Sequence, residues 1–127
     1  MIYLTKEQII LLHSSIIRKT GGTAGLRDES LLESAISAPL QTFEGTDMFL
    51  TDLQKIIRLS YGLIANHAFV DGNKRIGAHV LLILLSANKI SMEYSQQELI
   101  DCVLAIASGS LSYDEFCNWV IKHIKSS

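Results

Sequence analysis

Several features that mark particular protein classes are scarce in this sequence of 127 residues. It has one proline and eight glycines, and 48% of its residues are hydrophobic, which argues against long disordered segments and allows a buried core. A formal net charge of −2 gives no overall basic field, so a protein devoted to binding nucleic acid is disfavoured. Two cysteines, Cys102 and Cys117, lie in apolar segments of helical pattern and are expected to be buried thiols rather than a disulfide or a metal site.

Long hydrophobic runs and targeting signals are lacking too. Residues 1–7 contain no basic leader followed by an apolar run. The most apolar stretch, residues 76–87, is too short to span a bilayer and contains His79, so it predicts a helix in the middle of the core. We therefore expect a cytoplasmic protein without a membrane or a direct nucleic-acid partner. Its length has room for one domain, covering residues 1–127.

Helix starts are clearly marked along the chain. The capping box, in which two side chains satisfy free amides at a helix N-terminus, occurs at Thr5–Gln8, Thr51–Gln54, Ser95–Glu98 and Ser112–Glu115. Asp28 can cap another helix, and one more would start just after Gly72. The helix behind Thr51 is expected to end near Asn66, a residue that tolerates the left-handed conformation. Because apolar residues follow at helical spacing, the sequence predicts an all-α bundle of about six helices around a central apolar helix.

One segment departs from the helical pattern. Residues 40–49 place β-branched and aromatic side chains around Glu44-Gly45. Such a pattern fits either a short exposed hairpin or a loop.

The chemistry of the chain is concentrated between two of the predicted helices. A short polar connection, residues 67–72, is followed at once by Asn73, Lys74 and Arg75. A helix N-terminus presents unpaired N–H groups and partial positive charge, which favour a bound anion. Gly72 leaves room for a phosphate, and the two cations add formal charge where the helix dipole alone would disfavour it. The segment therefore predicts an anion site.

Two further residues of this connection suggest a reaction. His67 is suited to take a proton from a hydroxyl near neutral pH, and Asp71 is an oxygen ligand suited to Mg²⁺. Each residue alone has an ordinary explanation: a helix-end histidine, a turn, or a solvated pair of cations. Their coincidence within nine residues favours phosphoryl or nucleotidyl transfer.

The segment His67-x-Phe69-x-Asp71-Gly72-Asn73-Lys74-Arg75 resembles the signature of the Fic/Doc family, H-P-F-x-[D/E]-G-N-G-R-x-x-R. The chain's length, helical pattern and mid-chain motif are also similar to Doc-type toxins, although only these nine residues are diagnostic. The resemblance implies that His67 deprotonates a target hydroxyl and that Asp71 holds Mg²⁺. It implies that Asn73, Arg75 and the amides around Gly72 bind the phosphates of ATP. Phe69 would anchor the loop in the core.

Two departures from the signature bear on which group is transferred. Position 74 is Lys where family members that transfer AMP have Gly, and position 78 is Ala where they have a second Arg. Both resemble the Doc branch, which transfers the terminal phosphate, so Lys74 joins His67, Asp71 and Arg75 as an expected catalytic residue. The implied reaction phosphorylates a Ser or Thr hydroxyl of a host protein, such as elongation factor Tu, and arrests growth. AMP transfer, or a module that only binds a nucleotide or a partner, are the alternatives.

Control and docking are also implied by the resemblance. Family members that inhibit themselves carry [S/T]-x-x-x-E-[G/N], but Leu40 stands four residues before Glu44-Gly45, so a separate antitoxin is expected. The segment Gln41–Phe49 matches in position the flap that holds a target strand edge-on. Of the remaining histidines, His13 and His123 are expected at the surface or in packing, and His79 in the core or an interface.

Overall fold

The computed structural model describes residues 1–125. Within this range the chain forms six α-helices, which confirms the all-α prediction. A single 3-10 turn, η1 (Ala38–Leu40), and two short strands, β1 (Thr42–Phe43) and β2 (Thr46–Asp47), lie between the second and third helices. The helices are α1 (Lys6–Thr20), α2 (Glu29–Ser37), α3 (Asp52–Ala65), α4 (Asn73–Ala87), α5 (Gln96–Ala107) and α6 (Tyr113–His123).

Local capping explains where five of these helices begin. All four predicted capping boxes are formed, at the starts of α1, α3, α5 and α6. At α2 the Asp28 side chain accepts a hydrogen bond from the Leu31 amide, as predicted. Each cap satisfies amides that a helix leaves without a partner. Helix α4 differs, because its N-cap is Gly72 and no side chain caps it.

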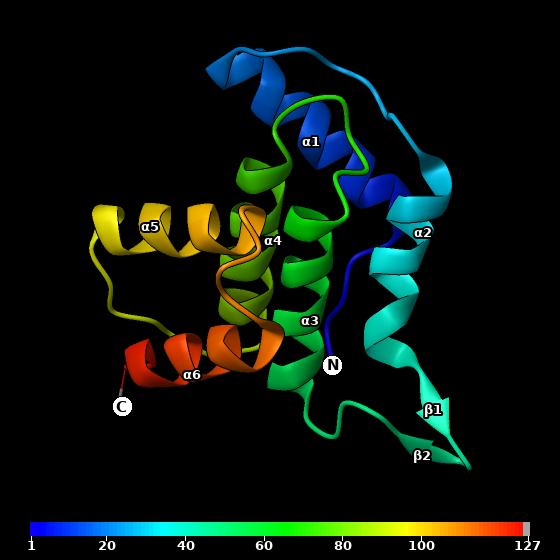
Figure 1. Ribbon diagram of the computed structural model, residues 1–127, viewed down its shortest axis with the longest axis vertical. Helices are drawn as coiled ribbons and strands as arrows, with labels where there is room; N and C mark the ends of the chain where they lie inside the picture. Colours follow the sequence, from blue (N-terminus) through cyan, green and yellow to red (C-terminus); the bar gives the residue numbers. More distant parts are fainter. Residues whose placement is uncertain (126–127) are drawn as a thin grey trace.

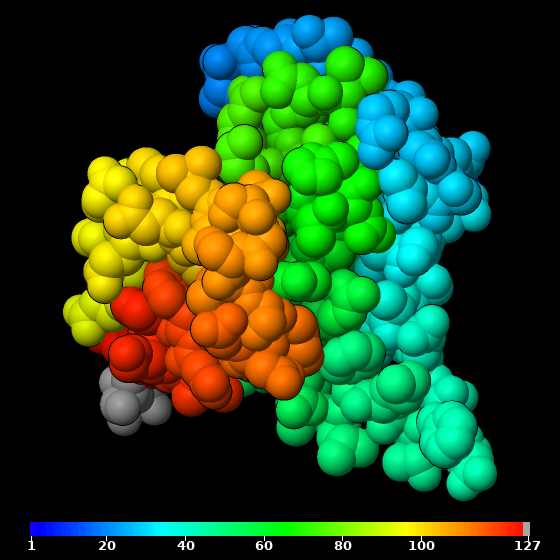
Figure 2. Space-filling view, in the orientation of Figure 1, coloured from blue at the N-terminus to red at the C-terminus, as the bar shows by residue number. Residues whose placement is uncertain are grey.

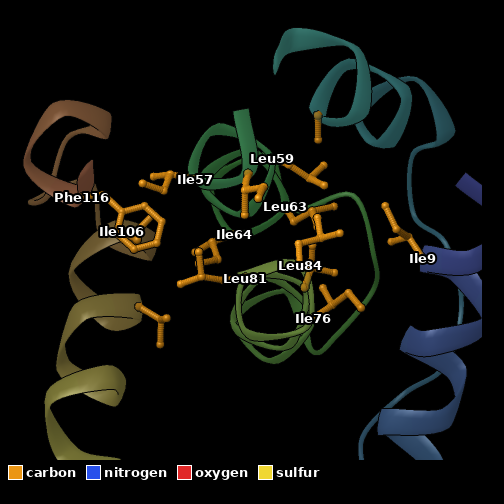
Figure 3. Close-up of a cluster of buried hydrophobic side chains, with 14 of the residues drawn as sticks. Ile9, Ile57, Leu59, Leu63, Ile64, Ile76, Leu81, Leu84, Ile106 and Phe116 are labelled. Carbon is orange, nitrogen blue, oxygen red and sulfur yellow. The ribbon is translucent and has the colours of Figure 1, made fainter. Parts of the chain in front are cut away.

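Helices α3 and α4 form the centre of the bundle, with α1 and α2 on one side and α5 and α6 on the other (Figure 1). Figure 3 shows their apolar side chains meeting between Ile9 of α1 and Phe116 of α6. The two central helices approach closely at Gly77, where a Cβ atom would lie 2.3 Å from Ile64 Cγ1. The Ser60 hydroxyl donates to the Gly77 carbonyl oxygen at 2.8 Å across the same contact. This packing fixes the ends of α3 and α4, and with them the loop between.

Residues 40–49 form the hairpin that was one of two expected conformations. Strands β1 and β2 pair antiparallel, and the turn residues Glu44 and Gly45 both have positive φ, as a type I′ turn requires. The hairpin projects from the body of the molecule (Figure 2). Its base is held by Lys55, whose Nζ donates to Asp47 Oδ2 at 3.1 Å and to the carbonyl oxygen of Phe49. Among the described residues, no helix is long and apolar enough to cross a membrane.

Candidate active site

The motif forms a loop, residues 66–72, between the end of α3 and the start of α4. Two of its residues have left-handed backbone conformations: His67, with φ 52°, and Gly72, with φ 75°. Helix α3 ends at Ala65 with Asn66 as its C-cap, which confirms the predicted end of this helix. Asn66 itself keeps a helical backbone rather than the left-handed one it could tolerate, and its side chain donates to the Leu31 carbonyl oxygen at 3.1 Å. The chain therefore reverses one residue later, at the histidine itself.

The motif residues line one cleft of about 340 Å³ at the N-terminal end of α4. All residues that the sequence singled out for catalysis, nucleotide binding or metal binding contribute to its wall. They are His67, Asp71, Gly72, Asn73, Lys74 and Arg75, joined there by Val70.

The backbone of His67 is fixed, whereas its side chain is free. The His67 carbonyl oxygen accepts a hydrogen bond from Arg27 Nε at 2.8 Å. The residue is exposed, and its ring makes no hydrogen bond with any described residue. An imidazole placed in this way can accept a proton from a hydroxyl that enters the cleft.

The carboxylate of Asp71 is held by backbone amides. Its Oδ2 accepts from the Thr23 amide at 3.1 Å, and its Oδ1 accepts from the Gly72 amide at 2.7 Å. These two bonds lower the pKa of the Asp71 carboxyl, and the Arg75 guanidinium, with Nη2 at 3.6 Å from Oδ1, adds to the effect. The side chain is 46% exposed, and each oxygen has a lone pair left. An ionised, accessible carboxylate fits Mg²⁺, which usually takes one or two carboxylates together with phosphates.

The start of α4 is the part of the cleft suited to an anion. Because Gly72 lacks a capping side chain, the first-turn amides of α4 have no side-chain acceptor among residues 1–125. Lys74 lies in this turn, is exposed, and has no hydrogen-bond or ion-pair partner within residues 1–125. Free amides and an unpaired cation favour bound phosphate.

Two motif residues have structural contacts that the sequence did not reveal. The Asn73 side-chain amide bonds both the amide and the carbonyl oxygen of Phe69, each at 3.0 Å, and so closes the loop. Arg75 Nη1 donates to the Thr20 hydroxyl and to the Gly21 carbonyl oxygen, the latter at 2.7 Å. Phe69 itself is 2% exposed, which confirms its expected place in the core.

The sequence also did not reveal the role of the strap, residues 21–28, which links α1 to α2 and runs beside the motif loop (Figure 1). Leu26 and Phe69 form an antiparallel bridge, and the Val70 amide donates to the Gly25 carbonyl oxygen at 3.0 Å. The amides of Arg27 and Asp28 both donate to the Ala68 carbonyl oxygen. The signal that could have indicated this role is the clustering of three glycines within residues 21–25.

Glycine is required at one point of the strap by close approach. Gly22 has φ 115°, and a Cβ there would lie 2.6 Å from Asp71 Oδ2 and 3.0 Å from Arg75 Nη2. Gly21 also has positive φ, but a Cβ there would meet nothing within 4 Å. Only Gly22 therefore makes room for the carboxylate.

Two histidines outside the motif lie near it. His13 on α1 is 1% exposed, and its Nε2 lies 2.7 Å from the Asp71 carbonyl oxygen, so it packs as expected but also contacts the loop. His79 is exposed, so of its two expected places the core is wrong, while a place in an interface stays a prediction. Its Nδ1 lies 2.9 Å from the Arg75 carbonyl oxygen. His79 lines the α4–α5 pocket, an apolar space of about 390 Å³ whose wall also includes Lys74, Arg75 and Ala78.

An all-α bundle whose two central helices are joined by this motif loop defines the protein as a helical transferase of the Fic type. The model of the family described as "Fic/DOC family" matches residues 3–85, and the chain belongs to this family. It is 29% identical over 115 residues to "Protein kinase doc" of Escherichia phage P1, covering 88% of this chain and 87% of that protein. It is 32% identical over 90 residues to "Toxin Doc" of Mycolicibacterium smegmatis, covering 71% and 67%. Within the family, the chain is Doc-like.

Proposed function

We propose that the chain is a Doc-like toxin that transfers the terminal phosphate of Mg-ATP to a Ser or Thr hydroxyl of a host protein. One observation carries the proposal: the unpartnered ring of His67, the ionised carboxylate of Asp71 and the uncapped start of α4 line the same cleft. A base, a carboxylate and an anion site together suit group transfer, whereas simple docking needs no base. The proposed domain covers residues 1–127, of which 126–127 lie outside the described residues, and acts in the cytoplasm.

The proposed step moves one phosphoryl group. His67 takes the proton of the target hydroxyl as the hydroxyl oxygen forms a bond to the γ-phosphorus of ATP. The bond between the γ-phosphorus and the β,γ-bridging oxygen breaks, and ADP leaves. Asp71 would hold Mg²⁺, which offsets phosphate charge when bound. The amides after Gly72 and the Lys74 ammonium would hold the remaining phosphates, with Asn73 and Arg75 fixing the loop or reaching the nucleotide.

Two positions favour phosphate over AMP as the transferred group. Lys74 extends from the first turn of α4 without a partner among residues 1–125, so its charge is available to a phosphate there. Ala78, where AMP-transferring relatives have a second Arg, lines the apolar α4–α5 pocket and offers no phosphate clamp. A nucleotide held by this changed set of cations would present a different phosphate to His67.

The partners proposed are an antitoxin and the host target. The α4–α5 pocket is apolar and bordered by Lys74, Arg75 and His79, so it suits an antitoxin segment that carries apolar and acidic side chains. The hairpin within Gln41–Phe49 offers an exposed edge to a target strand. Helix α3, 14 residues and about 20 Å long, separates the hairpin from the motif loop. The part of the target that docks on the hairpin would therefore be remote from the hydroxyl that is modified.

Expression in bacteria tests the proposed function. The wild-type protein should arrest growth and the His67→Asn variant should not. Intact-mass analysis of elongation factor Tu and other abundant proteins from the arrested cells should show added phosphate. An adenylyl adduct would replace the kinase proposal with AMP transfer, and equal growth of both cultures, at equal expression, would contradict the toxin assignment.

A further inference from the structure

His13 is one of two buried polar residues of the described chain, and it lies directly beneath the motif loop. Its ring stacks on Phe69, with the ring centroids 3.8 Å apart and the planes 13° from parallel. Its Nε2 lies 2.7 Å from the Asp71 carbonyl oxygen. His13 and Asp71 are 58 positions apart in the sequence, so this hydrogen bond joins α1 to one peptide of the motif loop.

The hydrogen bond determines which ring nitrogen of His13 carries hydrogen. A carbonyl oxygen only accepts, so Nε2 must be the donor. The bond therefore assigns the Nε2–H form to this buried ring. Without that donor, the Asp71 carbonyl oxygen would lose its partner beneath the loop, at a cost comparable to an unsatisfied buried group.

The bonded carbonyl belongs to the same planar peptide as the Gly72 amide. In a trans peptide the C=O and N–H point in opposite directions, so fixing one end fixes the other. The Gly72 N–H donates to Asp71 Oδ1 at 2.7 Å, and the Thr23 amide holds Oδ2. His13 thus sets the plane of the peptide whose other end orients the carboxylate. The same peptide leads into Gly72, the N-cap of α4.

We infer that His13 is a positioning residue: through the Asp71–Gly72 peptide it fixes the carboxylate of Asp71 in the orientation that receives Mg²⁺. The inference rests on the proposed function, because Asp71 is the proposed metal ligand there. A histidine that only filled space beside Phe69 would need the stacked ring but not the donor. The two contacts of His13 can therefore be removed separately.

A pair of substitutions separates the donor from the ring. His13→Phe keeps an aromatic ring against Phe69 but cannot donate, whereas His13→Gln keeps an amide donor near the place of Nε2 and loses the stack. His123→Phe is the control, because His123 is also stacked, on Trp119 at 4.2 Å, and also bonds a carbonyl oxygen, yet belongs to α6. For each folded variant, calorimetry measures the affinity for Mg-ATP and for ATP without the metal.

We expect a loss of affinity only in the His13→Phe variant and only for Mg-ATP. His13→Phe should weaken Mg-ATP binding by roughly tenfold or more, as supporting residues of metal ligands do, and leave metal-free ATP binding unchanged. His13→Gln should keep most of the Mg-ATP affinity despite a lower melting temperature, and His123→Phe should keep all of it. Equal Mg-ATP affinity of His13→Phe and the wild type would overturn the inference.

One measurement on the wild type needs no variant. Long-range ¹H–¹⁵N spectra should show hydrogen on Nε2 of His13, and a ring without hydrogen on Nε2 would overturn the inference even if His13→Phe does not fold. The proposed function fails separately. If the wild type binds no Mg-ATP, Asp71 has no metal role and the inference fails with the proposed function. If the wild type binds Mg-ATP and the His13 variants bind it equally well, only the inference fails.

Discussion

Arg27 Nε donates to the carbonyl oxygen of His67 at 2.8 Å, which joins the strap to the residue proposed as the base. His67 needs such support because its left-handed conformation, φ 52°, is strained for a residue with a side chain. The Arg27 amide also bonds the neighbouring Ala68 carbonyl oxygen at 2.8 Å. The guanidinium therefore positions the imidazole through the backbone and leaves the ring itself free.

Replacing this guanidinium should slow the reaction more than it weakens nucleotide binding. For Arg27→Met we expect kcat for protein labelling to fall by about tenfold, since a lost charged hydrogen bond of about 1.5 kcal/mol corresponds to that factor. KM for ATP should change little. The control is Arg18→Met, an exposed cation of α1. Steady-state kinetics with both variants make the comparison, and an unchanged kcat in Arg27→Met would contradict the positioning role.

Two neighbouring glycines give a matched test of the strap. Gly22→Ala would place a Cβ 2.6 Å from Asp71 Oδ2, so the carboxylate or the strap must move. Gly21→Ala carries a similar backbone penalty at φ 87° but meets no neighbour within 4 Å. We expect both variants to lose stability, and only Gly22→Ala to lose Mg-ATP affinity. Calorimetry and thermal melting check this, and equal Mg-ATP affinities would show that the close contact has no effect on the site.

The proposed base can be removed with little strain. Asn tolerates the left-handed conformation at position 67 better than most residues, so His67→Asn should fold with an unchanged melting temperature. Without the imidazole, protein labelling should fall by at least about a hundredfold. His123→Asn, at the far end of the fold, should label at the wild-type rate. Labelling by a folded His67→Asn variant at the wild-type rate would exclude His67 as the base.

A pH-dependent contact joins α5 to α6. The Trp119 carbonyl oxygen and then the Glu98 carboxylate, 3.0 Å from Nε2, raise the pKa of His123 above its ordinary 6.5. The Ser95 amide, with His123, lowers the pKa of Glu98 to about 2, so Glu98 stays ionised across the working range. Because the folded pKa of His123 is raised, its contribution to stability is full below the ordinary value and is lost as pH rises through the folded value.

The melting temperature should report this contact. Relative to the wild type, His123→Gln should melt lower at about pH 5, and the difference should shrink by about pH 9, where His123 is neutral in both states. Differential scanning calorimetry of both proteins at the two pH values makes the measurement. A difference that is the same at both, or larger at the higher pH, would contradict the charged contact.

Features encoded within a few residues could be predicted from the sequence. Each capping box depends on a side chain and an amide three positions apart, and all four formed as predicted. The position of the motif between two apolar helices was visible for the same reason. Such local pairs need no knowledge of the tertiary structure.

The supports of the motif could not be predicted, because they join distant positions. The bond of Arg27 to His67 spans 40 residues, and that of Thr23 to Asp71 spans 48. The core alternative for His79 was wrong for a related reason. Residues 80–85 are apolar without interruption, so the sequence does not show which face of α4 is buried. The buried face of α4, which includes Val80 and Leu84, is determined by its contact with α3.

The most direct test of the proposed kinase activity follows the α and the γ phosphate of ATP separately. The wild-type protein and His67→Asn are each incubated with Mg²⁺, bacterial lysate or purified elongation factor Tu, and ATP labelled at either the α or the γ phosphate. We expect label on protein from γ-labelled ATP alone, release of ADP, and none of this transfer with His67→Asn. Protein labelled from α-labelled ATP, with release of pyrophosphate, would contradict this expectation.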